Sequence, residues 1–177
     1  MLSIPLLWGI NKLLQPLGLS NIWWINTPSV LGVIGLLYKL FDKWIWRSGP
    51  LRTLGIIKTP DLNGEWKGYV ATSFDEHSDH HSVSVKIRQE WTRISIFLKS
   101  ARSESHSLTA SILTCQPGGV SISYEYKNEP KSFAESTMHA HRGTAILKLQ
   151  DLNKLEGEYY SGRDRNNFGS IKLKRMK

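Results

Sequence analysis

Cysteine is almost absent from this chain of 177 residues, which contains only Cys115. A single thiol cannot form an intrachain disulfide, and it argues against a zinc site built from thiolates. The signatures of nucleophilic catalysis are also missing, since there is no Gly-x-Ser-x-Gly motif and no cysteine context typical of a reactive thiol. The chain therefore fits a reducing compartment, and we expect no catalytic residue and no cofactor.

Charge is scarce at the start of the chain, where Lys12 is the only charged side chain in residues 1–38. The uncharged run over residues 13–38 has 26 residues, and about 20 apolar residues are enough to cross a bilayer. Proline and asparagine residues interrupt the run, which disfavours one straight helix. We expect two short transmembrane helices, Leu2–Leu19 and Pro28–Trp46, with Thr27 as the N-cap of the second.

The surroundings of the second expected helix favour a membrane anchor. Tryptophans flank it on both sides, as in the interfacial belt of membrane proteins, at Trp23, Trp24, Trp44 and Trp46. Residues 1–59 hold six Lys and Arg side chains against one acidic side chain, and most of these charges follow the apolar run. The positive-inside rule therefore predicts that residues 47–177 are cytoplasmic. An amphipathic helix pair packed on a soluble domain is the alternative.

The sequence changes character at Pro60, after an expected basic linker over residues 47–59. From there, apolar and polar residues alternate with the period of two that is typical of β-strands. Residues 73–82, which include three histidines, are expected to form a loop. The expected strands are Gly64–Thr72, Ser82–Glu90, Thr92–Ser100, Ser105–Thr114, Val120–Lys127, Arg142–Gln150, Lys154–Ser161 and Gly169–Arg175.

Eight hairpin-linked strands fit an antiparallel up-and-down barrel just wide enough for a small ligand, and a sandwich is the alternative. The first expected strand opens on Gly64-Glu65-Trp66. A Gly-x-Trp in this position resembles the lipocalin signature, in which the tryptophan closes the narrow end of the barrel and stacks on a basic residue of the last strand. The resemblance implies that Trp66 is this plug and that Arg175 stacks on it, a contact worth about 0.5–2 kcal/mol.

Several segments follow one another in an order that indicates a family: "LLYKLFDKWIWR", "PDLNGEWKGYV", "IRQEW", "KSARSES", "YEYKNEP", "HRGTAILKL", "LEGEYYSGR" and "GSIKLKR". Over nearly its whole length the chain resembles the two-transmembrane β-barrel effectors of bacterial CBASS, the cyclic-oligonucleotide-based antiphage system. The resemblance implies a lipocalin-like barrel in the cytoplasm, held by a multi-pass anchor in the bacterial inner membrane. It also implies that the barrel binds a cyclic dinucleotide made by a partner CD-NTase.

In this family, ligand binding is linked to homo-oligomerisation and to disruption of the lipid bilayer, which kills the infected cell before phage mature. The expected partners of this chain are therefore a cyclic dinucleotide, the bilayer and further copies of itself. No DNA or RNA polymer is expected, because the positive charge lies mostly beside the apolar segment rather than on the strand-rich part.

A cyclic dinucleotide has two phosphates and two flat bases, so its pocket needs cations and hydrogen-bond donors beside aromatic faces. Residues of this kind gather near one end of the expected barrel. The predicted ligand-binding residues are Ser100, Ser103, Tyr126, His141, Tyr159, Arg163 and Arg165. Each also has an ordinary interpretation, because tyrosines often fill cores, arginines are often solvated loop charges and serines often form turns.

A metal site is not expected. His139 and His141 lie on one side of an extended segment, a spacing that zinc can use, but the sequence offers no third ligand. Two rival functions stay open: a membrane-anchored lipocalin-like carrier of a small apolar ligand or lipid, and a membrane enzyme with a β-rich domain. A pocket lined only by aliphatic side chains and phenylalanine would favour the carrier, whereas convergent Arg, Ser and Tyr side chains would favour the nucleotide.

Overall fold

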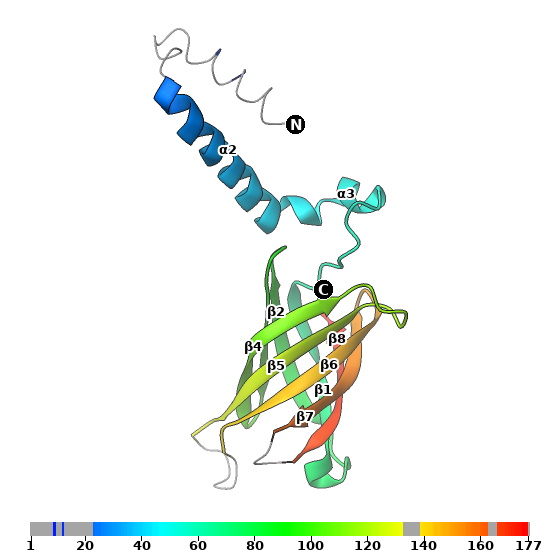
Figure 1. The fold of residues 1–177 in the computed structure, drawn as a ribbon. Coiled ribbons are helices and arrows are strands. Elements are labelled where there is room, and N and C mark those ends of the chain that lie inside the picture. The colour runs from blue at the N-terminus through cyan, green and yellow to red at the C-terminus, as the bar shows by residue number, and fades with distance from the viewer. Residues whose placement is uncertain (1–8, 10–11, 13–22, 133–138, 163–165, 177) are drawn as a thin grey trace. The chain divides into compact units, whose positions relative to one another are not determined.

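The structure is a computed structural model that describes residues 9, 12, 23–132, 139–162 and 166–176 (Figure 1). The chain divides into two compact units, residues 1–49 and residues 50–177. The second unit therefore begins ten residues before Pro60, where the sequence changes character. Ile57, which precedes Pro60, is buried.

The first unit contains α2 (Trp23–Lys43), followed by the 3-10 turn η2 (Ile45–Arg47). The other expected helix, Leu2–Leu19, lies almost entirely outside the described residues. The expected start of the second helix is wrong, because α2 begins at Trp23 and includes Thr27 and Pro28. At the sixth position of α2, Pro28 removes one backbone hydrogen bond of the helix, whereas at the expected first position no amide donor would have been needed.

None of the helices within the described residues combines the length and the apolar character that crossing a membrane requires.

The second unit opens with the short helix α3 (Gly49–Thr53), which overlaps the boundary between the units, and continues into a closed barrel of eight strands. Each strand pairs with its neighbours in the chain in antiparallel fashion, and β1 pairs with β8 to close the barrel. The expected antiparallel barrel is confirmed, and the sandwich is excluded. The strands are β1 (Gly64–Thr72), β2 (His81–Gln89), β3 (Ile94–Ser100), β4 (Ser103–Leu113), β5 (Ser121–Pro130), β6 (His141–Asp151), β7 (Lys154–Ser161) and β8 (Phe168–Arg175).

Apolar and polar residues alternate along the strands, and the apolar ones form the core of the barrel. In β2, Val83, Val85 and Ile87 are buried, whereas Ser84 and Lys86 between them are exposed. The loop expected over residues 73–82 contains the 3-10 turn η3 (Ser73–Asp75). It is shorter than predicted, because β2 already begins at His81. His81 pairs with Val70 of β1, and this pairing extends the sheet toward the end of the barrel.

One end of the barrel is closed by Trp66, which is completely buried. Its indole Nε1 donates to the Leu62 carbonyl at 3.1 Å. The guanidinium carbon of Arg175 lies 5.3 Å from the centre of the Trp66 ring, which is the contact expected from the resemblance to lipocalins. Arg175 Nη2 in turn donates to the carbonyls of Asp61, at 2.8 Å, and Asn63. A cation held over a buried ring in this way fixes the chain just before β1.

The segment over residues 60–63 completes this closed end by binding to Gln89, a buried residue at the end of β2. The Asn63 side-chain amide forms two hydrogen bonds with the backbone of Gln89, as a residue of a paired strand would. Its Oδ1 accepts from the Gln89 backbone N at 2.7 Å, and its Nδ2 donates to the Gln89 carbonyl at 2.9 Å. The Gln89 side chain binds back, accepting from Leu62 N at 2.8 Å and donating to the Pro60 carbonyl at 3.0 Å. Every polar group named here is therefore paired, as burial requires.

Candidate functional site

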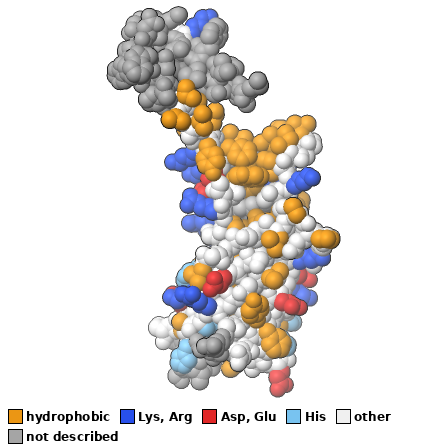
Figure 2. Space-filling model, viewed as in Figure 1, with side chains coloured by type: hydrophobic (Ala, Val, Ile, Leu, Met, Phe, Trp, Pro, Cys, Tyr) orange, Lys and Arg blue, Asp and Glu red, His pale blue; other side chains and the backbone are white. Residues whose placement is uncertain are grey.

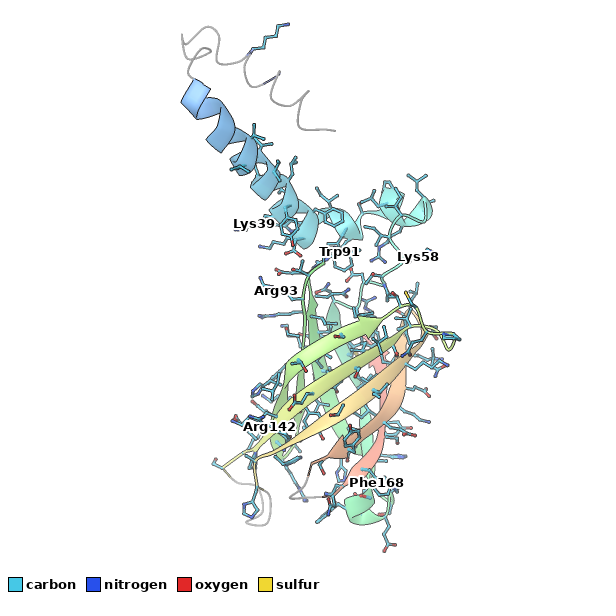
Figure 3. The ribbon with its side chains drawn as sticks, in the orientation of Figure 1. Lys39, Lys58, Trp91, Arg93, Arg142 and Phe168 are labelled. Atoms are coloured by element: carbon cyan, nitrogen blue, oxygen red, sulfur yellow. The ribbon has the colours of Figure 1, made fainter. Side chains whose placement is uncertain are left out.

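A cavity of about 390 Å³ lies in the other, open end of the barrel. At this end β1, β3, β5 and β7 finish and the following strands begin, so the residues at these strand ends surround the opening. Figure 3 shows Arg142 and Phe168 near this end, and Trp91 and Arg93 at the opposite one. The volume falls in the range of pockets that enclose a small organic ligand.

The cavity brings together five of the seven residues that the sequence predicts for ligand binding: Ser100, Ser103, Tyr126, His141 and Tyr159. The other two, Arg163 and Arg165, lie outside the described residues. Ligand binding by these seven side chains stays a prediction, but the five described ones lie around a single cavity although they come from strands β3 to β7.

Sequence reasoning missed several polar residues that line the same cavity: Thr72, His81, Asn128, Ser161 and Asn167. Strand phase could have found one of them, since Asn128 lies two residues after Tyr126 and therefore points to the same side of β5. His81 was missed because it lies in the segment that was expected to form a loop. Ser161 and Asn167 flank the β7–β8 connection, where the sequence looks like an ordinary turn.

Two glycines make room for the tyrosine rings of the cavity. Gly143 pairs with Tyr126, and an added Cβ at Gly143 would lie 2.4 Å from the Tyr126 hydroxyl. Gly169 pairs with Tyr159, and a Cβ there would lie 2.7 Å from the edge of the Tyr159 ring and 2.0 Å from a backbone oxygen. Such contacts are far below van der Waals distance, so larger residues at these positions would displace the aromatic wall.

Tyr124 and Tyr126 lie on β5 with ring centres 6.3 Å apart, and the His141 ring meets Tyr126 edge-on at the same centroid distance. Burial raises the pKa of Tyr124 well above its usual value, so its hydroxyl stays protonated at physiological pH. The cavity thus has a wall of aromatic surface, on which Tyr124 carries a neutral hydroxyl group. Such a wall suits a flat heteroaromatic base, which stacks on the rings.

The two histidines at strand starts are held by protein oxygens. His81 Nε2 lies 2.6 Å from the Asp75 carboxylate, which is largely buried, and His141 Nδ1 lies 3.0 Å from the His139 carbonyl. Because an oxygen of either kind accepts, each bonded nitrogen carries a proton and the orientation of each ring is fixed. Among the described residues, no group of three His, Cys, Asp or Glu side chains is placed to hold a metal ion.

The charge around the cavity favours an anion. Arg102 lines the cavity, and the lining side chains in the described part of the barrel include no Asp or Glu, while the nearby Asp75 carboxylate is bonded to His81. Lys131 adds a cation near the rim, where its Nζ donates to the carbonyls of Ser100 at 2.8 Å and Ala101 at 3.2 Å. In Figure 2 histidine side chains, in pale blue, lie near this end of the barrel. Cations, hydroxyls and aromatic faces are the groups that a nucleotide phosphate and base require.

The fold and the cavity define a class, the small closed antiparallel barrels that enclose a single ligand at an open end. Residues 57–175 match the sequence profile of the Cap15 cyclic dinucleotide receptor domain, and the chain belongs to this family. The matched range contains all eight strands, and it starts at the buried Ile57. The resemblance to the barrel effectors of CBASS is thereby confirmed.

Two bacterial proteins called CD-NTase-associated protein 15 are similar to this chain over most of its length. The one from Yersinia aleksiciae is 32% identical in an alignment 155 residues long that covers 82% of this chain and 68% of that protein. The one from Staphylococcus schleiferi is 28% identical over 158 residues, which are 89% of this chain and 83% of that protein. Both alignments are longer than the barrel, so the similarity extends into the N-terminal part.

Proposed function

We propose that this protein is a membrane-anchored antiphage effector whose cytoplasmic barrel binds a cyclic dinucleotide, and whose N-terminal part then disrupts the bacterial inner membrane. The observation that carries the proposal is the coincidence of the family match with the cavity: the receptor profile covers every described residue that lines it. Binding is non-catalytic, and its consequence is homo-oligomerisation and abortive infection.

The lining of the cavity favours a nucleotide over the rival apolar ligand. A lipid carrier needs a deep, continuous apolar surface, whereas here the aliphatic side chains share the cavity with Arg102, Asn128 and several serines. Asn128 is itself buried, and an apolar ligand would leave polar groups of this kind without a partner in a dry cavity. The hydroxyl, amide and imidazole groups instead match the oxygens and nitrogens of a dinucleotide.

The N-terminal unit has the surface of a segment that is covered in the working protein. Along α2, large apolar side chains are exposed at Leu31, Ile34, Leu36 and Tyr38. Gly32 and Gly35 lie among them with open space around their Cα atoms, and small residues of this kind permit close approach of helices within a bilayer. These features support a role of residues 1–46 as the anchor and as the part that breaches the membrane.

The segment over residues 47–59, which contains α3 and of which residues 50–59 belong to the second compact unit, couples the two activities. A barrel held about 13 residues from the bilayer passes its own association directly to the helices, because the chain between them is short. The ligand needs only to bind the associated form more tightly than the single form. A tenfold shift of this equilibrium requires about 1.4 kcal/mol of differential binding free energy, less than one charged hydrogen bond can supply.

A ligand panel tests the receptor role. We expect one of the cyclic di- or trinucleotides to raise the melting temperature of the full-length protein in detergent, since a ligand at 100 times its Kd adds about 2.7 kcal/mol of stability. The linear dinucleotides and a long-chain fatty acid serve as controls and are expected to have little effect. Stabilisation by the fatty acid alone would support the carrier and contradict the receptor.

Arg163 and Arg165 are proposed to contact the phosphates. The double substitution Arg163→Ala/Arg165→Ala should weaken nucleotide binding at least tenfold, because hydrogen bonds to charged groups are worth about 1.5–3 kcal/mol each, while the melting temperature without ligand stays unchanged. Lys172→Ala/Lys174→Ala, on the exposed face of β8, is the matched control that removes equal charge. Equal affinities of the two double variants would remove these arginines from the site.

The anchor has a separate test in cell fractionation. The full-length chain should sediment with membranes and resist extraction by alkaline carbonate, because its first 46 residues hold little charge and many apolar side chains. Residues 50–177, which form the second compact unit, should stay in the soluble fraction. Recovery of the full-length chain among the soluble proteins would contradict the anchor.

A further inference from the structure

The open end of the barrel carries the same polar arrangement twice, on opposite walls. In a closed barrel of eight strands, each strand faces the fourth strand after it, so β2 faces β6 and β3 faces β7. His81 begins β2 and His141 begins β6, while Ser100 ends β3 and Ser161 ends β7. All four side chains line the cavity.

The register shows that the two sets are equivalent. The residue two positions after each histidine pairs with the serine of the next strand: Val83 with Ser100 in one half, and Gly143 with Ser161 in the other. Each histidine therefore lies at the same height relative to the serine beside it. We define half-site A as His81 with Ser100, and half-site B as His141 with Ser161.

Two hydrogen bonds recur at both serines, although Ser100 Oγ also contacts Arg102 N and Ser103 Oγ. Ser100 Oγ accepts from the Ser103 backbone N at 3.0 Å and donates to the Ser103 carbonyl at 3.1 Å. Ser161 Oγ accepts from the Asn167 backbone N at 2.9 Å and donates to the Asn167 carbonyl at 3.0 Å. Each serine thus fixes the start of the following strand to the end of its own, which holds the two strand ends in matching positions.

We propose that half-sites A and B each bind one of the two phosphodiester groups of a cyclic dinucleotide, through His81 and His141. This inference rests on the proposed function and specifies its site. A cyclic dinucleotide carries its two phosphates on opposite sides of one closed ring, so it matches two equivalent groups on opposite walls. In each ring one nitrogen is bonded to a protein oxygen, and the other nitrogen donates to a phosphate oxygen when the ring is in its doubly protonated imidazolium form.

Deeper in the cavity, the side chains next to the two half-sites differ. The two bases of the bound dinucleotide therefore have unlike surroundings. Two residues before the serine, half-site A has Leu98 and half-site B has Tyr159, and both side chains line the cavity. Tyr126 adds a second aromatic ring beside half-site B, at 6.3 Å from His141. One base therefore stacks on tyrosine while the other packs on aliphatic side chains.

Calorimetric titration of the full-length protein in detergent tests the half-sites, with cyclic di-AMP, cyclic di-GMP and cyclic GMP–AMP as probes. His81→Asn and His141→Asn should each weaken binding of the preferred probe about tenfold, and the double variant about a hundredfold, because the two contacts reach different phosphates. His106→Asn, on the exposed face of β4, is the matched control and should bind as the wild type does. Melting temperatures without ligand check that each variant is folded.

Phosphorus NMR of bound cyclic di-AMP or cyclic di-GMP adds a readout that a structural role would not move. Unlike surroundings should split the single phosphorus resonance of either symmetric ligand into two, and each histidine substitution should shift a different one. If either histidine variant binds as the wild type does, or the double variant binds no worse than a single one, the half-sites are wrong although the receptor role stands. If the wild type binds none of the three probes and no other cyclic di- or trinucleotide of the panel, the proposed function fails first.

Discussion

Bacteria that produce the full-length chain together with an active CD-NTase are expected to lose nearly all ability to form colonies. Bacteria that produce residues 50–177 with the same enzyme should grow normally, because the second compact unit retains the cavity but lacks the apolar helices. The reason is the division of labour that we propose, in which the barrel senses the nucleotide and residues 1–46 breach the membrane.

Two controls make this experiment specific. The full-length chain with a catalytically inactive CD-NTase should be harmless, and immunoblots should show that the barrel unit accumulates to the level of the full-length chain. Killing by the barrel unit alone would show that the toxic activity lies in the barrel. Killing by the full-length chain without the nucleotide would show that the ligand does not control the anchor.

Replacing Trp66 by alanine is expected to produce the largest loss of stability of any single substitution in the barrel. Trp66 is completely buried, and removing a buried tryptophan usually costs about 3–5 kcal/mol of unfolding free energy. The substitution also removes the donor to Leu62 and the ring beneath Arg175, which loosens the segment that closes this end. Denaturant unfolding of the full-length protein in detergent measures the effect.

Trp91→Ala is the matched control for Trp66, because it removes the same side chain from a turn where it is partly exposed. We expect a clearly smaller loss of stability for this variant. A loss below about 1 kcal/mol for Trp66→Ala would be typical of a surface position. It would contradict the role of Trp66 as the plug of the closed end.

Strand phase explains why the barrel could be predicted from the sequence. Residues such as Val83, Val85 and Ile87 alternate with polar ones, and a period of two leaves only one way to face the core. The closed end could be predicted only in part. The contact between Trp66 and Arg175 was predicted from the Gly-x-Trp motif. The pairing of Asn63 with Gln89 was not, because it is made by a side chain with a backbone, and the alternation of apolar and polar residues does not reveal such bonds.

The candidate site, too, could be predicted only in part from the sequence. Tyr126 and Tyr159 were predicted because they are aromatic residues near the ends of expected strands, at one end of the barrel. The matching role of Ser161 depends instead on the register of β6 against β7. His81 was assigned to a loop because it follows another histidine and several polar residues, and its pairing with Val70 comes from the sheet. Position around a closed barrel is a property of all the strands together, so single segments do not reveal which residues face each other.

The most direct test of the account is dye release from vesicles of bacterial inner-membrane lipids that contain the purified full-length protein. We predict little release from the protein alone, and rapid release when the cyclic dinucleotide that binds it is added. The variant carrying both His81→Asn and His141→Asn should need a much higher nucleotide concentration for the same release. Release that is independent of the nucleotide, or intact vesicles despite saturated binding, would contradict the claim that ligand binding in the barrel is converted into membrane disruption.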